Sequence, residues 1–565
     1  MHGLRLRQDA RMRTRTWVVT LAAGLVLADA SIVTLALPEL LHALDTTVEG
    51  VAAVIAVYTL VLAVALLPAE RLVRRVGADA AGAGGFALFA AASVVCAVAG
   101  SLPLLLVARG VQALGGAAAL VAAFTLIAGG TQAGRRHWLG AAVFASAVGP
   151  ALGGALTQAF DWRAIFVVQI PIAAAGAVAA LRDPPEPAVT PIVEQQRDEP
   201  RRGRIADAAA LALVSAALVA VLFGLVLLLI AGWAIEPLAA AATVTVLPLG
   251  AIAGSRIHGP PRTRALCGSL LVGGGVLALA WLPSASVAWT LPPQALAGVG
   301  MGMALPAFAG ELLPERTARD AARLLTVRHA GIALVLIALA PLIAHRLDVV
   351  TERAQEQGVA LVLDAKLPPQ DKLSLAPALL GGVEAQRPRA GLRKALADNG
   401  RGYTGQDRVT YDTLAQRADD VLVSAVGDAF RIAFVIAGAL ALLGAAALAL
   451  GARRRALPAA ALAGVAALTV GLPAAYAAIH AHDEPQQVAL ANPCNPRKLP
   501  GTGGIAGFIQ DRALQALDAA ACRYGSTREE LVLALASDRA ARRFQQRHGV
   551  DPRSVTSLLQ GLIGP

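Results

Sequence analysis

Two charged side chains lie in stretches that are otherwise apolar enough to cross a membrane. Asp29 is in the middle of LADASIVTLALP, and Arg109 is in VARGVQALGGAAA, with Gln112 three residues further on. That spacing places Arg109 and Gln112 on one face of a helix. A charge inside a bilayer costs about 2.5–3.5 kcal/mol on insertion scales, so such residues are functional candidates. A carboxylate and a guanidinium that face one cavity can exchange a proton or a substrate. The alternative is that the two residues form a structural ion pair or line a solvated cavity.

A further titratable group lies later in the chain. Glu311 ends one apolar segment, and Arg328 and His329 open the next. An unperturbed imidazole changes its charge close to neutral pH. His329 is therefore a candidate for proton coupling or for lining a substrate cavity, and the alternative is a polar helix face near the membrane interface.

A helix-bending pattern occurs in AVGPALGGALTQ. Pro150 removes one internal helix hydrogen bond, and Gly149, Gly153 and Gly154 let neighbouring helices approach closely. The pattern predicts a place where helices pack tightly and bend, although the packing of small residues alone would explain part of it.

The elements that must position these residues follow from the apolar runs. Of the 565 residues, 56% are hydrophobic and 15% are charged, and the mean hydropathy is +0.61. A soluble domain carries about 25% charged residues, and a bilayer core of about 30 Å needs about 20 apolar residues in a helix. The composition excludes a soluble or disordered chain and indicates an all-α membrane protein. We expect thirteen spans, near 17–37, 48–68, 80–100, 103–129, 138–158, 164–181, 205–231, 235–254, 265–283, 287–310, 324–345, 430–450 and 457–481.

Basic residues decide the expected orientation of these spans. The net charge of +11 comes mostly from arginines in short segments between apolar runs, which indicates membrane topology rather than nucleic-acid binding. The positive-inside rule is satisfied when residues 1–16 are cytoplasmic. The central loop 182–204 is then cytoplasmic too, and the insert 346–428 and the tail 482–565 lie outside the cytoplasm. Amphipathic stretches in both outer segments predict short helices.

Four cysteines are too few for a disulfide framework. Cys96 and Cys267 lie in apolar runs and are expected to be small core residues. Cys494 and Cys522 lie in the tail, 28 positions apart, in what would be an oxidising compartment. A disulfide between them closes a loop of about thirty residues, which stabilises the fold by about 3–4 kcal/mol. The alternative is two unpaired thiols.

No sequence pattern indicates an enzyme or a resident cofactor. The phosphate-binding pattern, Gly-x-x-x-x-Gly-Lys followed by Ser or Thr, does not occur, which argues against direct use of ATP. No group of His and Cys has the spacing of a metal site. We therefore expect neither a cofactor nor a metal.

Four stretches, taken together, resemble the major facilitator superfamily, and within it the drug:proton antiporters of the multidrug-export type. The resemblance is strong over 17–175 and architectural over 205–481. The stretches are LADASIVTLALP around Asp29, RGVQALGGA from Arg109, GPALGG from Gly149 to Gly154, and DWRAIFVVQIP from Asp161 to Pro171.

The resemblance implies a major facilitator fold of two six-helix bundles, 17–181 and 205–450, around a central cavity. Such transporters work by alternating access, with the substrate site near the midplane. By this resemblance Asp29 corresponds to the acidic residue of the first-helix motif. Arg109 corresponds to the basic residue of the fourth-helix motif that is linked to proton coupling. The core of the antiporter motif, where the bundles slide during switching, corresponds to Gly149, Pro150, Gly153 and Gly154.

The sequence departs from the family pattern after the second span. The expected loop there reads Gly, Asp-Arg and Gly followed by basic residues, whereas this chain has PAERLVRRVGAD, with Glu70 in place of Gly and Arg74 in place of Asp. The charge relay that holds one state closed is therefore altered. Thr34 and Gln169 each replace an Asn, and the span 457–481 is an addition to twelve transporter helices. The candidate gate residues in this cytoplasmic loop are Glu70, Arg71, Arg74, Arg75 and Gly77.

The sequence thus predicts a proton-coupled antiporter of the cell membrane that exports a hydrophobic or amphipathic small molecule such as a drug. Its expected partners are that small molecule, protons and membrane lipids, with no nucleic acid, and the protein is expected to be a monomer. Two alternatives stay open. One is an exporter of an envelope lipid or glycolipid precursor whose outer segments handle the cargo, and the other is a receptor or scaffold that keeps the fold without transport.

Overall fold

The computed structural model is all-helical over the residues that it describes, which confirms the predicted all-α class. In that part of the chain the extended pairing is limited to an isolated bridge between Ala309 and Leu313. The described residues are 2–128, 138, 149–181, 201–309, 311–313, 317–372, 375, 388–450, 459–483 and 488–554.

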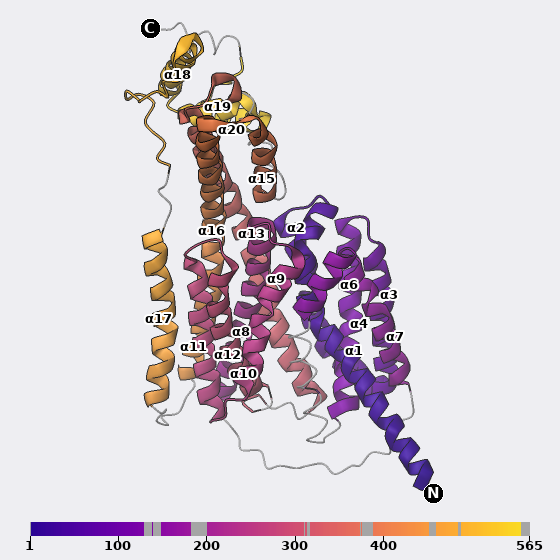
Figure 1. The fold of residues 1–565 in the computed structure, drawn as a ribbon. Coiled ribbons are helices and arrows are strands. Elements are labelled where there is room, and N and C mark those ends of the chain that lie inside the picture. Colours follow the sequence, from indigo (N-terminus) through magenta and orange to yellow (C-terminus); the bar gives the residue numbers. More distant parts are fainter. Residues whose placement is uncertain are drawn as a thin grey trace. The chain divides into compact units, whose positions relative to one another are not determined.

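Figure 1 labels the helices, which are described below as a first group, a second group and the remaining elements. The first group is α1 (His2–Ala43), α2 (Val48–Val76), α3 (Ala78–Val98), α4 (Leu102–Ala128), a helical stretch over 149–159, α6 (Ala164–Val167) and α7 (Gln169–Ala180). The second group is α8 (Arg201–Leu227), η1 (Leu228–Gly232), α9 (Pro237–Val244), α10 (Val246–Ser255), α11 (Pro261–Ala278), η2 (Leu279–Trp281), α12 (Val287–Phe308), α13 (Ala318–Asp364) and α16 (Gly405–Leu450). The remaining elements are α15 (Pro388–Asn399), η3 (Gly400–Gly402), α17 (Ala459–Asp483), α18 (Gly504–Tyr524), α19 (Arg528–Ala536) and α20 (Asp538–His548).

Two of the predicted spans are interrupted by a proline. The run 235–254 forms α9 and α10, because Pro248 has no N–H to donate to the carbonyl of Val244. Pro171 acts in the same way on the carbonyl of Val167, so the run 164–181 forms α6 and α7. Each interruption leaves a backbone carbonyl without its usual helical donor in the middle of an apolar segment.

Small residues bring the helices of each group into close contact. A Cβ atom on Gly85 of α3 would lie 2.6 Å from the backbone nitrogen of Ala119 on α4, which no real Cβ tolerates. The same holds in the second group, where a Cβ on Gly275 of α11 would lie 2.6 Å from the carbonyl oxygen of Pro293 on α12. Helices in a bilayer associate through such close packing, since lipid offers no hydrophobic drive between them.

Ten helices in the described residues are long and apolar enough to cross a membrane. The predicted spans 164–181 and 287–310 are not among the ten, and most of the predicted span 138–158 lies outside the described residues, as do 182–200 of the predicted central loop. The membrane-spanning character is therefore confirmed, and the count of thirteen stays a prediction.

The added helix α17 packs along α11. The backbone of Thr469 on α17 would meet any Cβ placed on Gly274, and Tyr476 Oη donates to the carbonyl oxygen of Trp289 at 2.9 Å. Only 17% of the most apolar window of α17 is buried. Such a helix attaches at the edge of the second group and leaves most of its surface to lipid.

The chain divides into two compact units. Unit 1 comprises Met1–Ile230, Ile235–Ala344 and Phe430–Asp483, and unit 2 comprises Ala231–Ala234, His345–Ala429 and Glu484–Pro565. The predicted insert and tail thus both contribute to unit 2. Within it, Ala521 and Leu531 pack with Phe544, and a disulfide joins Cys494 to Cys522 at the end of α18.

Candidate functional site

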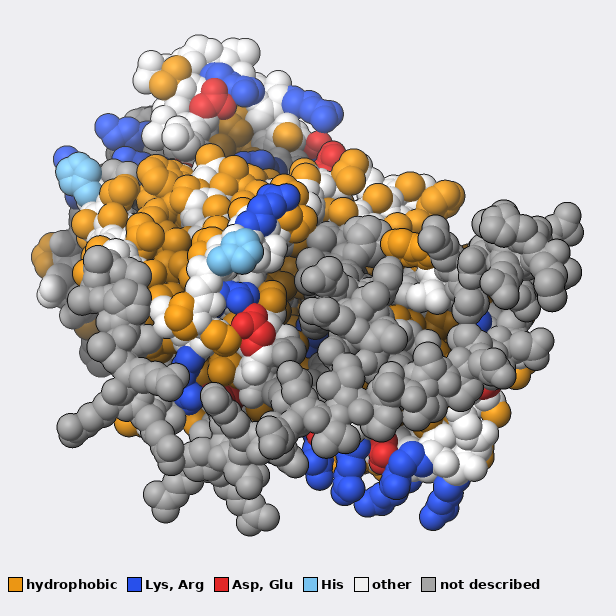
Figure 2. All heavy atoms as spheres, turned by 90° about the horizontal axis from the view of Figure 1, so that it is seen from below, with side chains coloured by type: hydrophobic (Ala, Val, Ile, Leu, Met, Phe, Trp, Pro, Cys, Tyr) orange, Lys and Arg blue, Asp and Glu red, His pale blue; other side chains and the backbone are white. Residues whose placement is uncertain are grey.

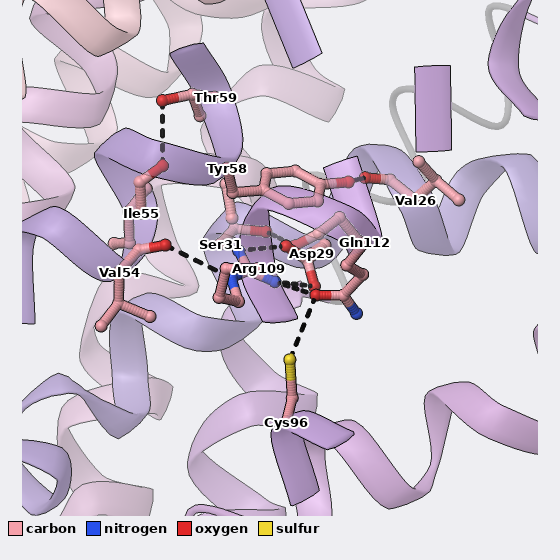
Figure 3. Close-up of polar contacts among 12 residues, drawn as sticks. Val26, Asp29, Ser31, Val54, Ile55, Tyr58, Thr59, Cys96, Arg109 and Gln112 are labelled. Atoms are coloured by element: carbon pink, nitrogen blue, oxygen red, sulfur yellow. Dashed lines mark hydrogen bonds and ion pairs between the residues drawn. The ribbon is translucent and has the colours of Figure 1, made fainter. Parts of the chain in front are cut away.

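Asp29 on α1 and Arg109 on α4 form an ion pair inside the first group of helices (Figure 3). Arg109 Nη1 lies 2.9 Å from Asp29 Oδ1, and Arg109 Nη2 lies 2.6 Å from Asp29 Oδ2. Both side chains are completely buried. The first contact is a hydrogen bond, and the second is a close ion-pair contact without hydrogen-bond geometry. Because removing one partner of a buried pair costs about 3–5 kcal/mol, each charge holds the other in place.

The guanidinium of Arg109 has further partners on α2. Its Nε donates to the carbonyl oxygen of Val54 at 3.3 Å, and its central carbon lies 4.2 Å from the centroid of the Tyr58 ring. Tyr58 Oη in turn donates to the carbonyl oxygen of Val26 on α1 at 3.1 Å. Arg109 therefore has a backbone acceptor and an aromatic face on α2 that do not depend on the charge of Asp29.

Glutamines extend the ion pair into a closed polar cluster. Arg109 Nη1 donates to Gln112 Oε1 at 2.6 Å, and Gln112 Nε2 donates to Gln169 Oε1 at 2.8 Å. Gln169 Nε2 then donates to Asp29 Oδ1 at 2.9 Å, which closes the ring. Ser93 on α3 accepts a hydrogen bond from Gln112 Nε2 at 2.8 Å. The cluster therefore joins α1, α3, α4 and α7 through side chains that are all buried.

Sequence reasoning brought together three members of this cluster and missed the others. Asp29 and Arg109 stand out as charges in apolar runs, and Gln112 follows from the helical spacing. Gln169 stands out in the sequence only as a replacement for Asn, and Ser93 and Tyr58 carry no signal beyond being polar in apolar segments. Their partnership depends on the packing of four helices.

His329 lies apart from this cluster. It is buried on α13, and its Nδ1 is 2.8 Å from the carbonyl oxygen of Leu325 one turn earlier. Among the described residues no hydrogen bond or ion pair joins His329 to Asp29, Arg109 or Gln112. The role predicted for His329 stays a prediction.

The glycines of the predicted antiporter motif lie against helices of both groups. On α1, a Cβ on Gly149 would overlap the Ser31 side chain, and a Cβ on Gly153 would overlap the Ile32 carbonyl. A Cβ on Gly154 would overlap Ala241 on α9. The same helical stretch also contacts α9 directly, because Gln158 Oε1 accepts a hydrogen bond from the backbone nitrogen of Leu238 at 2.7 Å. Pro150 lies in the first turn described for this stretch. The glycines thus permit contact between the first group and the second.

The candidate gate residues form the end of a helix rather than a loop. Glu70 is buried and pairs with Arg74 Nε at 2.7 Å, one turn along α2, while Arg71 and Arg75 are exposed. The predicted loop over these residues is therefore wrong, because the i,i+4 pair and the basic last turn extend α2 to Val76. Gly77 alone separates α2 from α3, at a φ of +88° that favours glycine. Figure 2 shows a group of Lys and Arg side chains standing out on the face seen from below.

The described residues contain no group of His, Cys, Asp and Glu placed to hold a metal ion. What the polar cluster offers chemically is a carboxylate, held by charge, that can bind one proton. Binding that proton would cancel the charge that joins α1 to α4.

Comparison with known proteins identifies the family of this chain. Residues 19–340 match the family model of the Major Facilitator Superfamily. The Multidrug resistance protein Stp of Mycobacterium tuberculosis is 33% identical over 171 residues, which are 28% of this chain and 32% of that protein. The Methylenomycin A resistance protein of Bacillus subtilis is 31% identical over 173 residues, 29% of this chain and 37% of that protein. The chain thus spans about a third of the length of these relatives.

Solved structures agree on the fold. A bacterial homologue of the human lysosomal transporter Spinster, in an inward-facing and unoccupied conformation, superposes with a TM-score of 0.51 at 16% identity. The superposition covers 79% of this chain and 99% of the other. Because the family model covers more than half of the residues, this chain belongs to the major facilitator superfamily.

Proposed function

We propose that the protein is a proton-coupled antiporter that exports a hydrophobic or amphipathic small molecule. The observation that carries the proposal is the buried pair of Asp29 and Arg109, a protonatable group enclosed within membrane-spanning helices. The names of the similar proteins, which include a multidrug resistance protein, a methylenomycin A resistance protein and the drug efflux pump JefA, support a drug as cargo.

The coupling step is the binding of one proton by Asp29. The proton forms an O–H bond on a carboxylate oxygen and removes the negative charge, while Arg109 keeps Gln112 Oε1, the Val54 carbonyl and the Tyr58 ring. The charge that ties α1 to α4 is then gone, so the helices can rearrange. Release of the proton on the other side restores the pair. The membrane potential adds about 2.3 kcal/mol per 100 mV to each charge moved.

The orientation belongs to the same proposal. Arginines in the short segments favour a cytoplasmic N-terminus, which puts the C-terminus and unit 2 outside. The disulfide between Cys494 and Cys522 supports that side, since disulfides persist in oxidising compartments.

Flux measurements in proteoliposomes test the proposal. Ethidium is loaded inside or outside, and its movement is followed with and without an imposed proton gradient. We expect gradient-dependent ethidium transport by the wild type, and we expect Asp29→Asn to abolish it while leaving membrane insertion intact. Normal proton-driven flux in Asp29→Asn would remove this carboxylate from the mechanism. Absence of flux for ethidium and for a neutral dye alike would instead favour the receptor alternative.

A second candidate function, export of an envelope lipid or glycolipid precursor, is favoured by one surface of unit 2. On α18 the side chains of Ile505, Phe508 and Ile509 are 82%, 63% and 60% exposed, at the i, i+3, i+4 spacing of one helix face. The guanidinium of Arg512 lies 5.4 Å from the Phe508 ring. An apolar face beside a cation suits an acyl chain with an anionic head.

Substitutions on that face separate the two functions. Phe508→Gln with Ile509→Gln should leave ethidium transport unchanged but abolish release of a fluorescent acyl lipid if unit 2 handles cargo. Val409→Gln is the matched control, because Val409 is 58% exposed on α16 in the same unit. Equal lipid release by the double variant and this control would eliminate the second candidate.

A further inference from the structure

Gln169 occupies a place in the polar cluster that sequence reasoning did not assign. It is the first residue of α7, directly after the interruption that Pro171 imposes, and its side chain is completely buried. Its Nε2 donates to Asp29 Oδ1 at 2.9 Å, the same oxygen to which Arg109 Nη1 donates at 2.9 Å. Within the described residues, this is the hydrogen bond that connects α7 to Asp29.

The donors and acceptors of the ring determine one another. Arg109 has donors only, so Gln112 must present its oxygen to it and its amide nitrogen to Gln169. Gln169 then accepts from Gln112 through Oε1 and has its Nε2 left to donate to Asp29. This arrangement requires that Asp29 Oδ1 only accepts, and the ionised carboxylate is the form in which it accepts most strongly.

A proton on Asp29 disturbs this arrangement. If it sits on Oδ1, that oxygen becomes a donor facing two donors, Arg109 Nη1 and Gln169 Nε2. If it sits on Oδ2, it faces Arg109 Nη2, 2.6 Å away. A proton on Oδ1 breaks the ring, whereas a proton on Oδ2 keeps the ring but turns Oδ1 into an uncharged carbonyl oxygen. In both cases the buried amide of Gln169 has a weaker acceptor than the ionised carboxylate.

We propose that Gln169 is a positioning residue that stabilises the ionised, Arg109-bound form of Asp29 and ties α7 to α1 until the carboxylate takes up a proton. The inference rests on the proposed function for the meaning of that proton. The titratable groups that face Asp29 from the neighbouring helices are Arg109 on α4, Tyr58 on α2 and Cys96 on α3. Gln169 is the contribution of α7, and it is neutral at every pH.

Infrared spectroscopy of the full-length protein tests this without any cargo. The C=O stretch of the Asp29 carboxylic acid is titrated with pH in nanodiscs and assigned by its loss in Asp29→Asn. Gln169→Met has a similar shape but no donor, so the acid band should appear at a pH higher by about one unit or more, because a hydrogen bond to the charged form is lost. Gln169→Asn keeps an amide that is one methylene shorter, and it should shift the band in the same direction by less.

Ser93→Ala is the matched control. Ser93 is equally buried, accepts from Gln112 Nε2 and lies 3.4 Å from Gln169 Oε1, but in the described part of the chain no hydrogen bond joins it to Asp29. Because Ser93→Ala keeps the Gln169 donor to Asp29, the band should titrate close to its wild-type pH. A band that titrates at the same pH in wild type, Gln169→Met and Gln169→Asn overturns the proposal, as does a band absent from all three. A shifted band in a protein that moves no ethidium would uphold the role of Gln169 and reject the transport function, so the two failures are distinguishable.

Discussion

Arg262 on α11 and Asp207 on α8 form an ion pair, with Arg262 Nη2 3.1 Å from Asp207 Oδ1. Arg262 Nε also donates to the carbonyl oxygen of Leu448 near the end of α16, at 3.4 Å. In the first group, Arg15 on α1 pairs with Asp79 on α3 and donates to the last carbonyls of α7. One cation in each group thus joins the helices of the first, third and sixth predicted spans. The base lies on the first and the acid on the third of these spans in the first group, and the reverse holds in the second group.

The two pairs should differ in their contribution to stability. Removing Arg262 leaves Asp207 completely buried without this cation, whereas removing Arg15 leaves Asp79 with a side chain that is 38% exposed. We expect Arg262→Gln to lower the free energy of unfolding by about 3 kcal/mol and Arg15→Gln by about 1 kcal/mol or less. Thermal unfolding in detergent measures both, with Asp207→Asn combined with Arg262→Gln as the compensated control. Equal losses for the two single variants would contradict the argument from burial.

Stability and transport should separate at the central ion pair. Asp29→Asn leaves the buried guanidinium of Arg109 without its counter-charge. The unfolding free energy should fall by about 3–5 kcal/mol, and the contacts of Arg109 with Gln112 and the Tyr58 ring should offset part of that loss. Adding Arg109→Gln removes the orphaned charge, so the double variant should recover most of the unfolding free energy while remaining inactive. Parallel measurements of unfolding and of proton-driven ethidium flux check this. Recovery of flux together with stability would mean that the pair serves only the fold.

The sequence predicts the helical fold and the charged part of the site because both follow from local patterns. Asp29, Arg109 and Gln112 are recognisable from composition and helical spacing alone. Gln169 is not, since its role depends on the interruption at Pro171 and on the packing of α7 against α1. The expected loop at Glu70 failed for a related reason: a buried carboxylate with a partner one turn away continues the helix, and the family pattern does not show this pairing.

Close packing at the antiporter motif gives another prediction. A Cβ on Gly153 would overlap the backbone carbonyl of Ile32, which cannot rotate away, so Gly153→Ala must separate the two helices. We expect a loss of about 1–3 kcal/mol in unfolding free energy and a slower ethidium flux. Gly84→Ala is the control, because nothing lies within 4 Å of its added Cβ, and inside α3 it should raise the unfolding free energy by about 0.5–1 kcal/mol through helix propensity alone. An unchanged flux in Gly153→Ala would show that this contact does not limit transport.

Unit 2 supplies a prediction about pH that is independent of transport. Lys372 is buried, and its Nζ donates to the carbonyl oxygen of Leu363 at 2.8 Å. Burial lowers the pKa of Lys372 from 10.5 to about 8, against the opposing attraction of Asp364 and Asp511 and with a further lowering by Arg528. Between those two values the unfolded chain binds more protons at this lysine than the folded one does.

Stability should therefore rise with pH through that window, because the ammonium that burial disfavours is lost from the folded protein first. Below pH 8 the folded protein carries the full cost of the charge, so Lys372→Met should be the more stable protein there. Its advantage should shrink as the pH approaches 10.5. Scanning calorimetry at both ends of the window measures the difference. Lys366→Met, at an exposed lysine six positions earlier, should show no such trend, and a constant difference between Lys372→Met and wild type would refute the assignment of this titration to burial.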